Sequence, residues 1–227
     1  MIRRLPESAK AAISATFSIT CLAAAAEELL LNSLDAQSTS IELSLRFSNF
    51  EVKVEDDGQG MPDLHLVGEA HCSSRIPTVP SYGSRGCALH SIGVLSTVEI
   101  SSRVDNVTIG KIISFGKEVW SGEVSGAKDA KGTVVVVKGL FSHQIVRQRT
   151  LNHRQELERI LNSVTRLSLM HPSVSFIIRD EDARSQDNRP GREILRIPRA
   201  ANTLLRILKP FPLPLLQTLH SRVNMVR

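Results

Sequence analysis

The amino-acid sequence predicts an α/β protein, because segments with helical periodicity alternate along the chain with segments that have strand periodicity. Apolar residues recur at helical spacing over residues 8–36 and 150–169, whereas apolar and polar residues alternate strictly over residues 41–47 and 51–56. The run 134–137 is apolar on both faces, which is typical of a central strand. With 227 residues, of which 41% are hydrophobic, the chain can bury one sizeable core.

The first half of the chain predicts a helix in two pieces and then a hairpin. The helical pattern spans residues 8–36, and the strands at 41–47 and 51–56 are expected to pair through a turn at 48–50. Because only alternate residues of these strands are apolar, we expect one face of the pair to be buried. The segments that follow predict a Gly/Pro/Asp turn region, a polar loop and a short apolar helix, at residues 56–63, 71–86 and 87–95.

The second half predicts further strands around one amphipathic helix. Three strands are expected at residues 97–104, 107–115 and 132–140, then a helix over 150–169 and a strand over 173–180. From about Asp182 onward, Pro and Arg are mixed with short apolar stretches, and this pattern supports no long element. We therefore expect one domain over residues 1–182 and an irregular tail over 183–227.

Composition argues against membrane-spanning and disulfide-bonded classes. No stretch approaches the about 18 consecutive apolar residues of a membrane-spanning helix, and the N-terminus makes a poor signal sequence. The three cysteines, Cys21, Cys72 and Cys87, are odd in number and lack a C-x-x-C spacing, so we expect reduced thiols rather than a disulfide framework or a zinc site. We expect an intracellular protein with no membrane partner.

The net charge of +5 is distributed unevenly. Residues 1–140 hold 13 Lys/Arg against 16 Asp/Glu, whereas residues 141–227 hold 15 against 7. A basic C-terminal part fits either a nucleic-acid surface or a solvated basic face, and the clustered aromatic residues that stack on bases are missing.

Polar residues in the leucine-rich segment "EELLLNSLDA" form the first candidate site. Glu28, Asn32 and Asp35 are spaced four and three apart, so they share one helix face, whereas Leu29 and Leu30 point elsewhere. A carboxylate can act as a general base, and an amide oxygen one turn later can bind a hard cation such as Mg²⁺. An ordinary amphipathic helix is the alternative reading.

The second candidate site is "VEDDGQGM", in which a strand ends in two acids followed by two glycines. Gly58 and Gly60 allow the backbone to approach a flat ligand closely, and Asp56 can accept a hydrogen bond from an exocyclic amine such as that of adenine. The alternative is a plain Asp-Gly hairpin turn, although the residues that follow do not continue as a returning strand.

The third candidate site is "YGSRGCALHSI", where Gly83 and Gly86 lie just ahead of a predicted helix. Backbone amides at a helix N-terminus favour a phosphate group, and Arg85 adds a positive charge. A glycine before a helix is also commonplace. The segment is neither a P-loop nor a nucleophile elbow, because both of those motifs are absent.

The order of these features resembles that of the GHKL ATPases, the family that includes gyrase, Hsp90, histidine kinases and MutL. The segments "EELLLNSLDA", "DDGQGM" and "SRGCALHSI" look like the MutL-type motifs E-L-x-x-N-S-x-D-A, D-N/D-G-x-G-[IM] and F-R-G-E-A-L-x-S-I. The double Asp, "LVGE" and "LSLMHPS" look most like the eukaryotic MutL homologue of the MutL-gamma heterodimer, particularly its plant form. The resemblance covers about residues 2–180.

The resemblance implies the Bergerat fold, a two-layer α/β sandwich with a mixed β-sheet and helices on one face. It also implies ATP and Mg²⁺ as cofactors. Glu28 looks like the general base, Asn32 like the magnesium ligand and Asp56 like the residue that reads adenine. The other residues that it assigns to the nucleotide site are Asp35, Gly58, Gly60, Met61, Ser73, Ser74, Arg75, Gly83, Arg85, Gly86, Ala88, Leu89 and Thr133.

The resemblance further implies a role for the whole protein in DNA mismatch repair and in meiotic recombination. In this family, ATP binding closes a clamp between two such domains, so we expect another MutL homologue as partner, mismatched or branched DNA as ligand, and a nuclear setting. Arg147 and Arg149 match a basic segment of the family, and we expect them to contact nucleic acid.

Several positions depart from the family pattern. Leu31 stands where many members have Glu, Cys87 replaces the Glu of R-G-E-A-L, Ser84 replaces an aromatic residue, and Ile145 replaces a Pro. The segment before Gly83 is shorter than the usual lid, and the second, transducer lobe of the family is not recognisable in the tail. We therefore expect nucleotide binding to outlast hydrolysis. A catalytically silent interaction or DNA-binding module is the alternative, and another GHKL member such as a kinase is a third reading.

Overall fold

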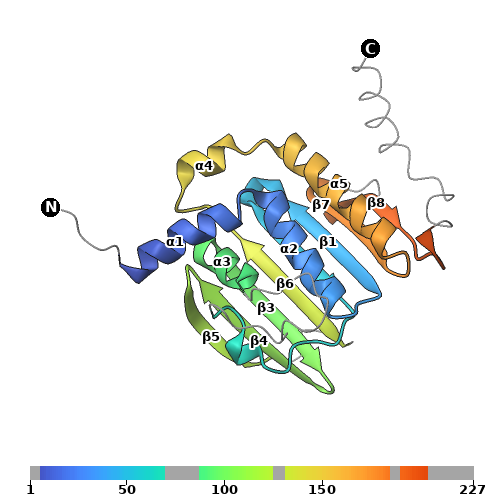
Figure 1. The fold of residues 1–227 in the computed structure, drawn as a ribbon, viewed down its shortest axis with the longest axis horizontal. Helices are drawn as coiled ribbons and strands as arrows, with labels where there is room; N and C mark the ends of the chain where they lie inside the picture. Colours follow the sequence, from blue (N-terminus) through green and yellow to red (C-terminus); the bar gives the residue numbers. More distant parts are fainter. Residues whose placement is uncertain (1–5, 70–86, 125–130, 185–189, 204–227) are drawn as a thin grey trace, which may run out of the picture.

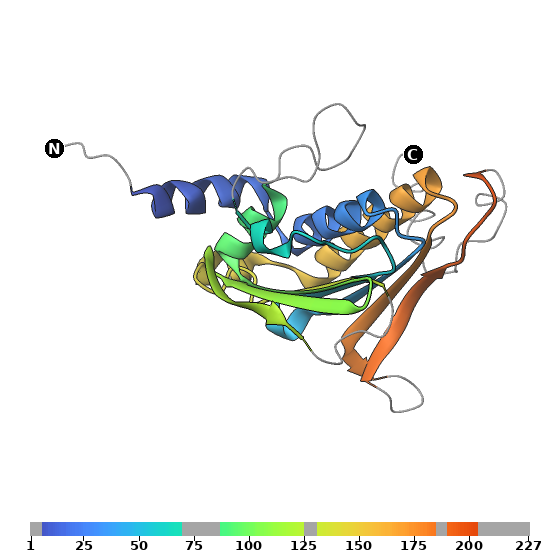
Figure 2. The same ribbon diagram turned by 90° about the horizontal axis from the view of Figure 1, so that it is seen from below.

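Eight strands form one mixed sheet, and helices lie on one side of it (Figures 1 and 2). The structure is a computed structural model that describes residues 6–69, 87–124, 131–184 and 190–203. The strand order is β5-β4-β3-β6-β2-β1-β7-β8. The predicted α/β arrangement, with a mixed sheet and helices on one face, is confirmed.

Within the described residues, five helices and two short 3-10 turns accompany the strands. The helices are α1 (Glu7–Ser18), α2 (Leu22–Asp35), α3 (Ala88–Leu95), α4 (Ile145–Thr150) and α5 (His153–Met170), and the turns are η1 (Phe47–Asn49) and η2 (Leu64–Leu66). The strands are β1 (Ser40–Arg46), β2 (Glu51–Asp56), β3 (Thr97–Val104), β4 (Val107–Ser114), β5 (Lys117–Glu123), β6 (Gly132–Lys138), β7 (Ser175–Arg184) and β8 (Pro190–Ile197).

The N-terminal helical segment is divided as predicted. Ile19 ends α1 with an extended conformation, φ −106° and ψ 96°, and Cys21 is also extended. Among the described residues no single helix is long and apolar enough to cross a membrane, and α1 and α2 reach that length and composition only together, across a bend of 84°. The bend turns α2 onto the sheet, where its leucines join the core.

The hairpin of β1 and β2 forms with the predicted antiparallel pairing, and it places Asp56 in the middle of the sheet. Ile41 of β1 lies opposite Asp56, and Thr133 of β6 lies opposite it on the other side. β1 also pairs in parallel with β7. The end of β2 is therefore fixed from both sides by neighbouring strands.

One face of the central strands is buried, as their alternation predicts. Leu43 and Leu45 of β1 and Val52 and Val54 of β2 are each at most 1% exposed and pack beneath the helices. Burial of such a side chain contributes about 1.5–3 kcal/mol. β6 is central, as predicted, but its buried side chains are those at 133, 135 and 137, whereas those at 134 and 136 lie on the more open face.

Two elements of the middle region were not predicted. β5 is the edge strand of the sheet, and nearly all its residues are exposed, so the sequence "KEVWSGE" lacks the alternation that marks a half-buried strand. α4 has six residues and no buried side chain, so it carries no apolar stripe. A sequence pattern that arises from burial therefore predicts neither β5 nor α4.

The expectation of an irregular tail is wrong for residues 190–197, which form β8. This strand pairs antiparallel with β7, and Leu195 and Ile197 are at most 3% exposed. Pro190 and Gly191 at the start of the strand and the adjacent apolar pair Ile194 and Leu195 break the regular alternation in the sequence. β7 also extends beyond the predicted end, to Arg184. Residues 204–227 lie outside the part that the structure describes.

Candidate functional site

Asn32, the middle residue of the polar stripe of α2, borders a pocket against the central strands, whereas Glu28 and Asp35 do not line it. Leu29 and Leu30 are at most 2% exposed, whereas Glu28 and Asn32 are only partly buried. Asn32 lines the pocket together with residues from α2, β2, β6, α3 and the loop after β2, namely Leu29, Ser33, Ala36, Val54, Asp56, Met61, Leu89, Thr133 and Val135. The helix thus buries its leucines and presents an amide to the pocket.

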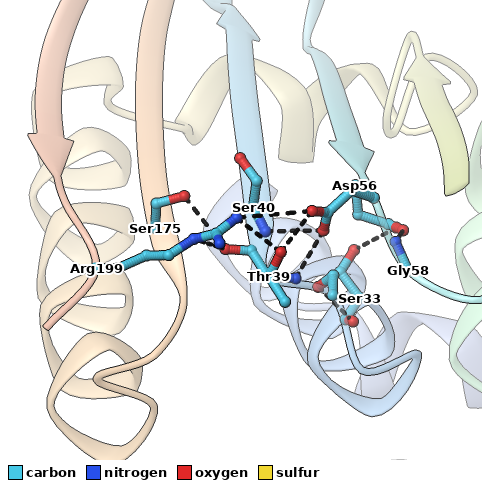
Figure 3. A network of polar contacts seen from close by, with 9 residues as sticks. Ser33, Thr39, Ser40, Asp56, Gly58, Ser175 and Arg199 are labelled. Atoms are coloured by element: carbon cyan, nitrogen blue, oxygen red, sulfur yellow. Dashed lines mark hydrogen bonds and ion pairs between the residues drawn. The ribbon is translucent and has the colours of Figure 1, made fainter. Parts of the chain in front are cut away.

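Asp56 is a buried carboxylate in the wall of this pocket, and it is only 6% exposed (Figure 3). Its Oδ2 atom accepts a hydrogen bond of 2.8 Å from the Ser33 hydroxyl, and its Oδ1 atom accepts one of 2.9 Å from the Gly58 N–H. Burying a carboxylate is costly unless its oxygens are hydrogen-bonded. These two donors hold the carboxylate in one orientation beside the pocket.

The pocket is narrow in this structure, with room for about one water molecule. Its walls are apolar except for Asn32, Ser33, Asp56 and Thr133.

The two glycines of "DDGQGM" are required for different reasons. A Cβ on Gly58 would lie 2.8 Å from the Cβ of Ala36, so this position allows the strand end to pack against the end of α2. Gly60 has φ +78°, and a Cβ there would lie 2.7 Å from the Arg103 carbonyl oxygen. The close neighbours of both glycines are protein atoms, so the predicted approach of the backbone to a flat ligand stays a prediction.

Sequence reasoning missed the residues that support Asp56. Ser33 directly follows Asn32 in the helix, and only the folded structure brings its hydroxyl to Asp56. Gly132, at the start of β6, has φ +132°, and a Cβ there would lie 2.0 Å from the Asp56 carbonyl oxygen. The signal for Gly132 was a glycine ahead of the "TVVVV" run, which can be interpreted only once the register is known.

Met61 and Thr133 are connected through one hydroxyl group. The Met61 N–H donates to the Ser102 Oγ over 2.7 Å, and Ser102 Oγ lies 3.3 Å from Thr133 Oγ1. Both Ser102 and Thr133 are at most 2% exposed. The pocket rim is therefore anchored to β3 and β6.

Glu28 has the electrostatic character of a proton acceptor. Burial raises the pKa of its carboxyl group, and the negative charge of Glu27 raises it further. Glu27 itself is held by α5, because it accepts a hydrogen bond of 2.6 Å from Ser163 and forms an ion pair with Arg166. The neighbouring acid is therefore fixed in position beside Glu28.

A buried carboxylate from α5 fixes the start of α2. Glu156 is 2% exposed, and its Oε2 accepts a hydrogen bond of 2.8 Å from the Ala23 N–H in the first turn of α2. Arg159 pairs with the other oxygen at 2.8 Å. Because the first N–H groups of a helix lack partners within it, this carboxylate supplies a cap from another element.

Several predicted site residues lie elsewhere or outside the described residues. Asp35 does not line the pocket, and it lies close enough to His171 for its charge to oppose the lowering of the His171 pKa that burial causes. Ala88 begins α3 directly before Leu89, which does line the pocket. The remaining predicted residues, Ser73, Ser74, Arg75, Gly83, Arg85 and Gly86, lie outside the part that the structure describes.

The two arginines expected to contact nucleic acid differ in their surroundings. The Arg147 guanidinium donates to the carbonyl oxygens of Thr16, Ile19 and Thr20 at 3.2, 3.4 and 3.0 Å, and it lies 4.4 Å from the Phe141 ring centre. It therefore caps the C-terminus of α1. Arg149 is exposed.

The donor set suits a cation that is held mainly by phosphate oxygens. No group of three or more His, Cys, Asp or Glu side chains capable of holding a metal ion occurs within the described ranges. Mg²⁺ in nucleotide sites commonly takes one or two protein oxygens together with phosphates and waters. Asn32 lies at the pocket, and the binding of Mg²⁺ by its amide oxygen stays a prediction.

A second polar network lies directly beside Asp56 (Figure 3). The Asp57 carboxylate accepts hydrogen bonds from the backbone N–H of Thr39 at 2.6 Å, from that of Ser40 at 2.8 Å and from the Thr39 hydroxyl at 2.6 Å. Burial pushes the pKa of Asp57 upward, but these hydrogen bonds together bring it below the ordinary value. The turn after β2 is thereby attached to the start of β1.

Comparisons with known proteins agree with this geometry. Residues 19–121 match the family model described as "Histidine kinase-, DNA gyrase B-, and HSP90-like ATPase". The chain is 31% identical over 224 residues to the DNA mismatch repair protein Mlh3 of Homo sapiens, covering 94% of this chain and 15% of that protein. It is 32% identical over 192 residues to the DNA mismatch repair protein MLH3 of Arabidopsis thaliana, covering 79% of this chain and 16% of that protein.

Solved structures show the same fold. The Aquifex aeolicus MutL ATPase domain complexed with ADP matches with a TM-score of 0.63 and 25% identity, over 80% of this chain and 64% of that one. The chain spans about one sixth of the length of the two curated relatives.

Proposed function

Because this chain carries an ATPase domain of the MutL mismatch-repair type, we propose that it binds ATP with magnesium and hydrolyses it slowly. Within the whole protein, this domain would act as the nucleotide-driven module of DNA mismatch repair. Another MutL homologue is the proposed partner, and the nucleus is the proposed location. The alternative remains a silent module that keeps the fold and binds no nucleotide.

The anchored carboxylate of Asp56 is the observation that supports nucleotide binding best. Ser33 and Gly58 fix its orientation in a largely apolar pocket, which suits a flat ring with an exocyclic amine. The adenine amino group would donate to this carboxylate. Leu29, Val54 and Val135 would contact the ring faces, because all three line the same pocket.

The α2 stripe supplies the remaining chemistry. Glu28 would accept a proton from the attacking water, and its raised pKa makes it a stronger base than an ordinary carboxylate. Asn32, one turn along the helix, would hold the cation through its amide oxygen. When bound, Mg²⁺ would neutralise negative charge on the phosphate oxygens.

Slow turnover is proposed because two polar positions of the family pattern are apolar or uncharged here. Leu31 packs against the hydrophobic core, so it offers no polar group to the site. Cys87 occupies the N-cap of α3 and makes no side-chain capping hydrogen bond. Both differences would affect the positioning of phosphates and water, whereas Asp56, Gly58 and Gly60, which would bind adenine, keep the family pattern.

The proposal is tested by calorimetric titration with ATP and a non-hydrolysable analogue in the presence of magnesium. We expect Asp56→Asn to weaken binding strongly, because the amide presents an N–H donor where adenine needs an acceptor. Glu55→Gln is the matched control, because Glu55 precedes Asp56 in β2 and pairs with Lys53 at 3.1 Å. Turnover should be lost in Glu28→Ala while ATP binding persists.

The outcomes separate the two readings. Binding that is lost in Asp56→Asn and retained in Glu55→Gln supports the adenine site. A folded wild-type chain that binds no ATP would contradict the proposal and favour the silent module. Binding without measurable turnover would confine the function to nucleotide-dependent switching.

A further inference from the structure

The Arg199 side chain joins the segment that follows β8 to Thr39 and Asp57, which lie near Asp56. Arg199 Nε donates to the Thr39 carbonyl oxygen over 3.1 Å, and its Nη2 donates to the Thr39 hydroxyl over 2.7 Å (Figure 3). The same Nη2 lies 3.8 Å from the Asp57 carboxylate. Arg199 therefore contacts both residues that join the start of β1 to the turn after β2.

Thr39 is also held from β7. Its carbonyl oxygen accepts hydrogen bonds from the Ser175 N–H at 3.0 Å and from the Ser175 hydroxyl at 3.2 Å. Thr39 thus receives donors from Ser175 and Arg199 while its own N–H and hydroxyl face Asp57. Thr39 therefore connects β7, the segment after β8 and the turn after β2 that contains Asp57.

The position of Arg199 is itself defined by the fold. It lies two residues after the end of β8, and the next residue, Ala200, is 8% exposed and donates its N–H to the Pro172 carbonyl oxygen over 2.7 Å. Farther along, the Thr203 hydroxyl donates to the Leu169 carbonyl oxygen at the end of α5. The guanidinium therefore approaches Thr39 from an anchored backbone.

The turn after β2, which Asp57 attaches to the start of β1, supplies one of the hydrogen-bond donors to the Asp56 carboxylate. The Gly58 N–H that orients the Asp56 carboxylate follows Asp57 directly, and the Gln59 N–H donates to the Ala36 carbonyl oxygen over 3.0 Å. Ala36 in turn packs against Gly58. A shift of Thr39 and Asp57 therefore moves the residues that aim Asp56 at the pocket.

We propose that Arg199 is a positioning residue for the adenine site, which acts through Thr39 and Asp57 to keep the Asp56 carboxylate aimed at the base. This inference rests on the proposed nucleotide function and adds a determinant from outside the region that matches the family model, residues 19–121. The side chains of Arg199 and Asp57 are 55% and 41% exposed. Exposed pairs contribute little to global stability, so the effect is expected on loop order and ligand discrimination.

The test compares ATP with inosine triphosphate, which lacks the exocyclic amine that Asp56 would read. In Arg199→Met we expect ATP binding to weaken about fivefold, the effect of losing roughly one hydrogen bond, with a much smaller change for inosine triphosphate. The preference for ATP over inosine triphosphate should therefore fall. Arg199→Lys keeps the charge but cannot donate from two nitrogens in the same fork, so it should recover only part of the preference.

Arg196→Met is the matched control. Arg196 is 54% exposed, lies within β8 between two buried residues, and pairs with Glu193 rather than with Thr39 and Asp57. Its ATP preference should equal that of the wild type. An unchanged preference in Arg199→Met, with the control behaving normally, would overturn the inference.

Amide hydrogen exchange without nucleotide separates this inference from the proposed function. Arg199→Met should accelerate exchange of the amides at residues 39–40 and 58–59, whereas the centre of the sheet should keep its protection. Faster local exchange would show that Arg199 orders the residues around Asp56 even if the wild-type chain bound no ATP, so that such a failure would lie with the proposed function alone. Unchanged exchange at these amides would contradict it irrespective of nucleotide binding.

Discussion

Glu28 occupies a position where its ionised form is unfavourable. Burial and the charge of Glu27 both raise the pKa of its carboxyl group above the ordinary value of 4.5. The folded state therefore prefers the neutral form, so stability that is present at low pH is lost as the pH rises through the raised pKa. The same shift makes the carboxylate a better proton acceptor at neutral pH.

Replacing this acid should stabilise the protein while abolishing turnover. Glu28→Gln removes the buried charge and its repulsion from Glu27, so thermal unfolding at neutral pH should occur at a higher temperature than in the wild type. The gain should shrink as the pH is lowered toward the pKa of Glu28. A melting temperature that falls at neutral pH would show that the carboxylate makes favourable contacts instead.

Some residues of the candidate site could be predicted from the sequence, and others could not. Glu28, Asn32 and Asp56 were predicted from local sequence patterns. Glu28 and Asn32 are polar residues in an apolar helix, and Asp56 is an acid at a strand end shortly before a glycine. Ser33 and Gly132 were not, because each acts on a partner that only the fold provides: Ser33 lies 23 residues from Asp56, and Gly132 faces the carbonyl group of Asp56 across the sheet. Their roles depend on register.

At the scale of elements, the corner between α1 and α2 is held by α4. Arg147 donates to three carbonyl oxygens at the end of α1, where the last helical carbonyl groups lack partners within the helix. The Gln144 side-chain amide donates to the Thr16 hydroxyl at 3.2 Å. α4 therefore sets the direction from which the chain enters α2.

Arg147→Ala should lower the free energy of unfolding by about 1–3 kcal/mol, because the carbonyl groups lose charged donors and Phe141 loses its cation contact. Arg149→Ala is the control, since Arg149 is exposed on the same helix and should change stability little. Chemical denaturation of both variants measures the difference. Equal stabilities of the two variants would show that the corner does not depend on Arg147.

Helices and strands could be predicted where burial of one side gives the sequence a periodic pattern of apolar residues. The stripe of α5 and the alternation of β1 and β2 arise because one side of each element packs on the core, and Ile160 and Val164 are indeed at most 1% exposed. β5 has no such pattern because it is exposed, and α4 because it has no buried side chain. β8 is half-buried, but Pro190 and Gly191 at its start and the adjacent apolar residues Ile194 and Leu195 interrupt its alternation.

At the scale of the whole molecule, the positive charge is concentrated after residue 140. Some of these charges serve the fold: Arg147 caps α1, Arg166 pairs with Glu27, and Arg199 holds Thr39. The surface proposed for DNA must therefore rely on exposed side chains such as Arg149, since cations committed to carbonyl groups contribute less to phosphate binding.

Reversing the charge of Arg149 should weaken DNA binding without unfolding the protein. In Arg149→Glu we expect lower affinity for duplex DNA and a shallower dependence of the binding constant on salt, because about one phosphate contact is lost. Lys117→Glu on the edge strand β5 is the comparison variant. Fluorescence anisotropy over a salt series measures both quantities, and identical salt slopes for wild type and Arg149→Glu would exclude Arg149 from the interface.

The contact between Thr39 and Arg199 joins residues 160 positions apart in the chain. Contacts of such long range are slow to form, because closing a long loop costs chain entropy before the contact stabilises the fold. During synthesis on the ribosome, the helix that carries Glu28 and the strand that carries Asp56 emerge long before Arg199 does. The nascent chain therefore passes through a stage in which the pocket residues have been made but the contact that steadies them has not.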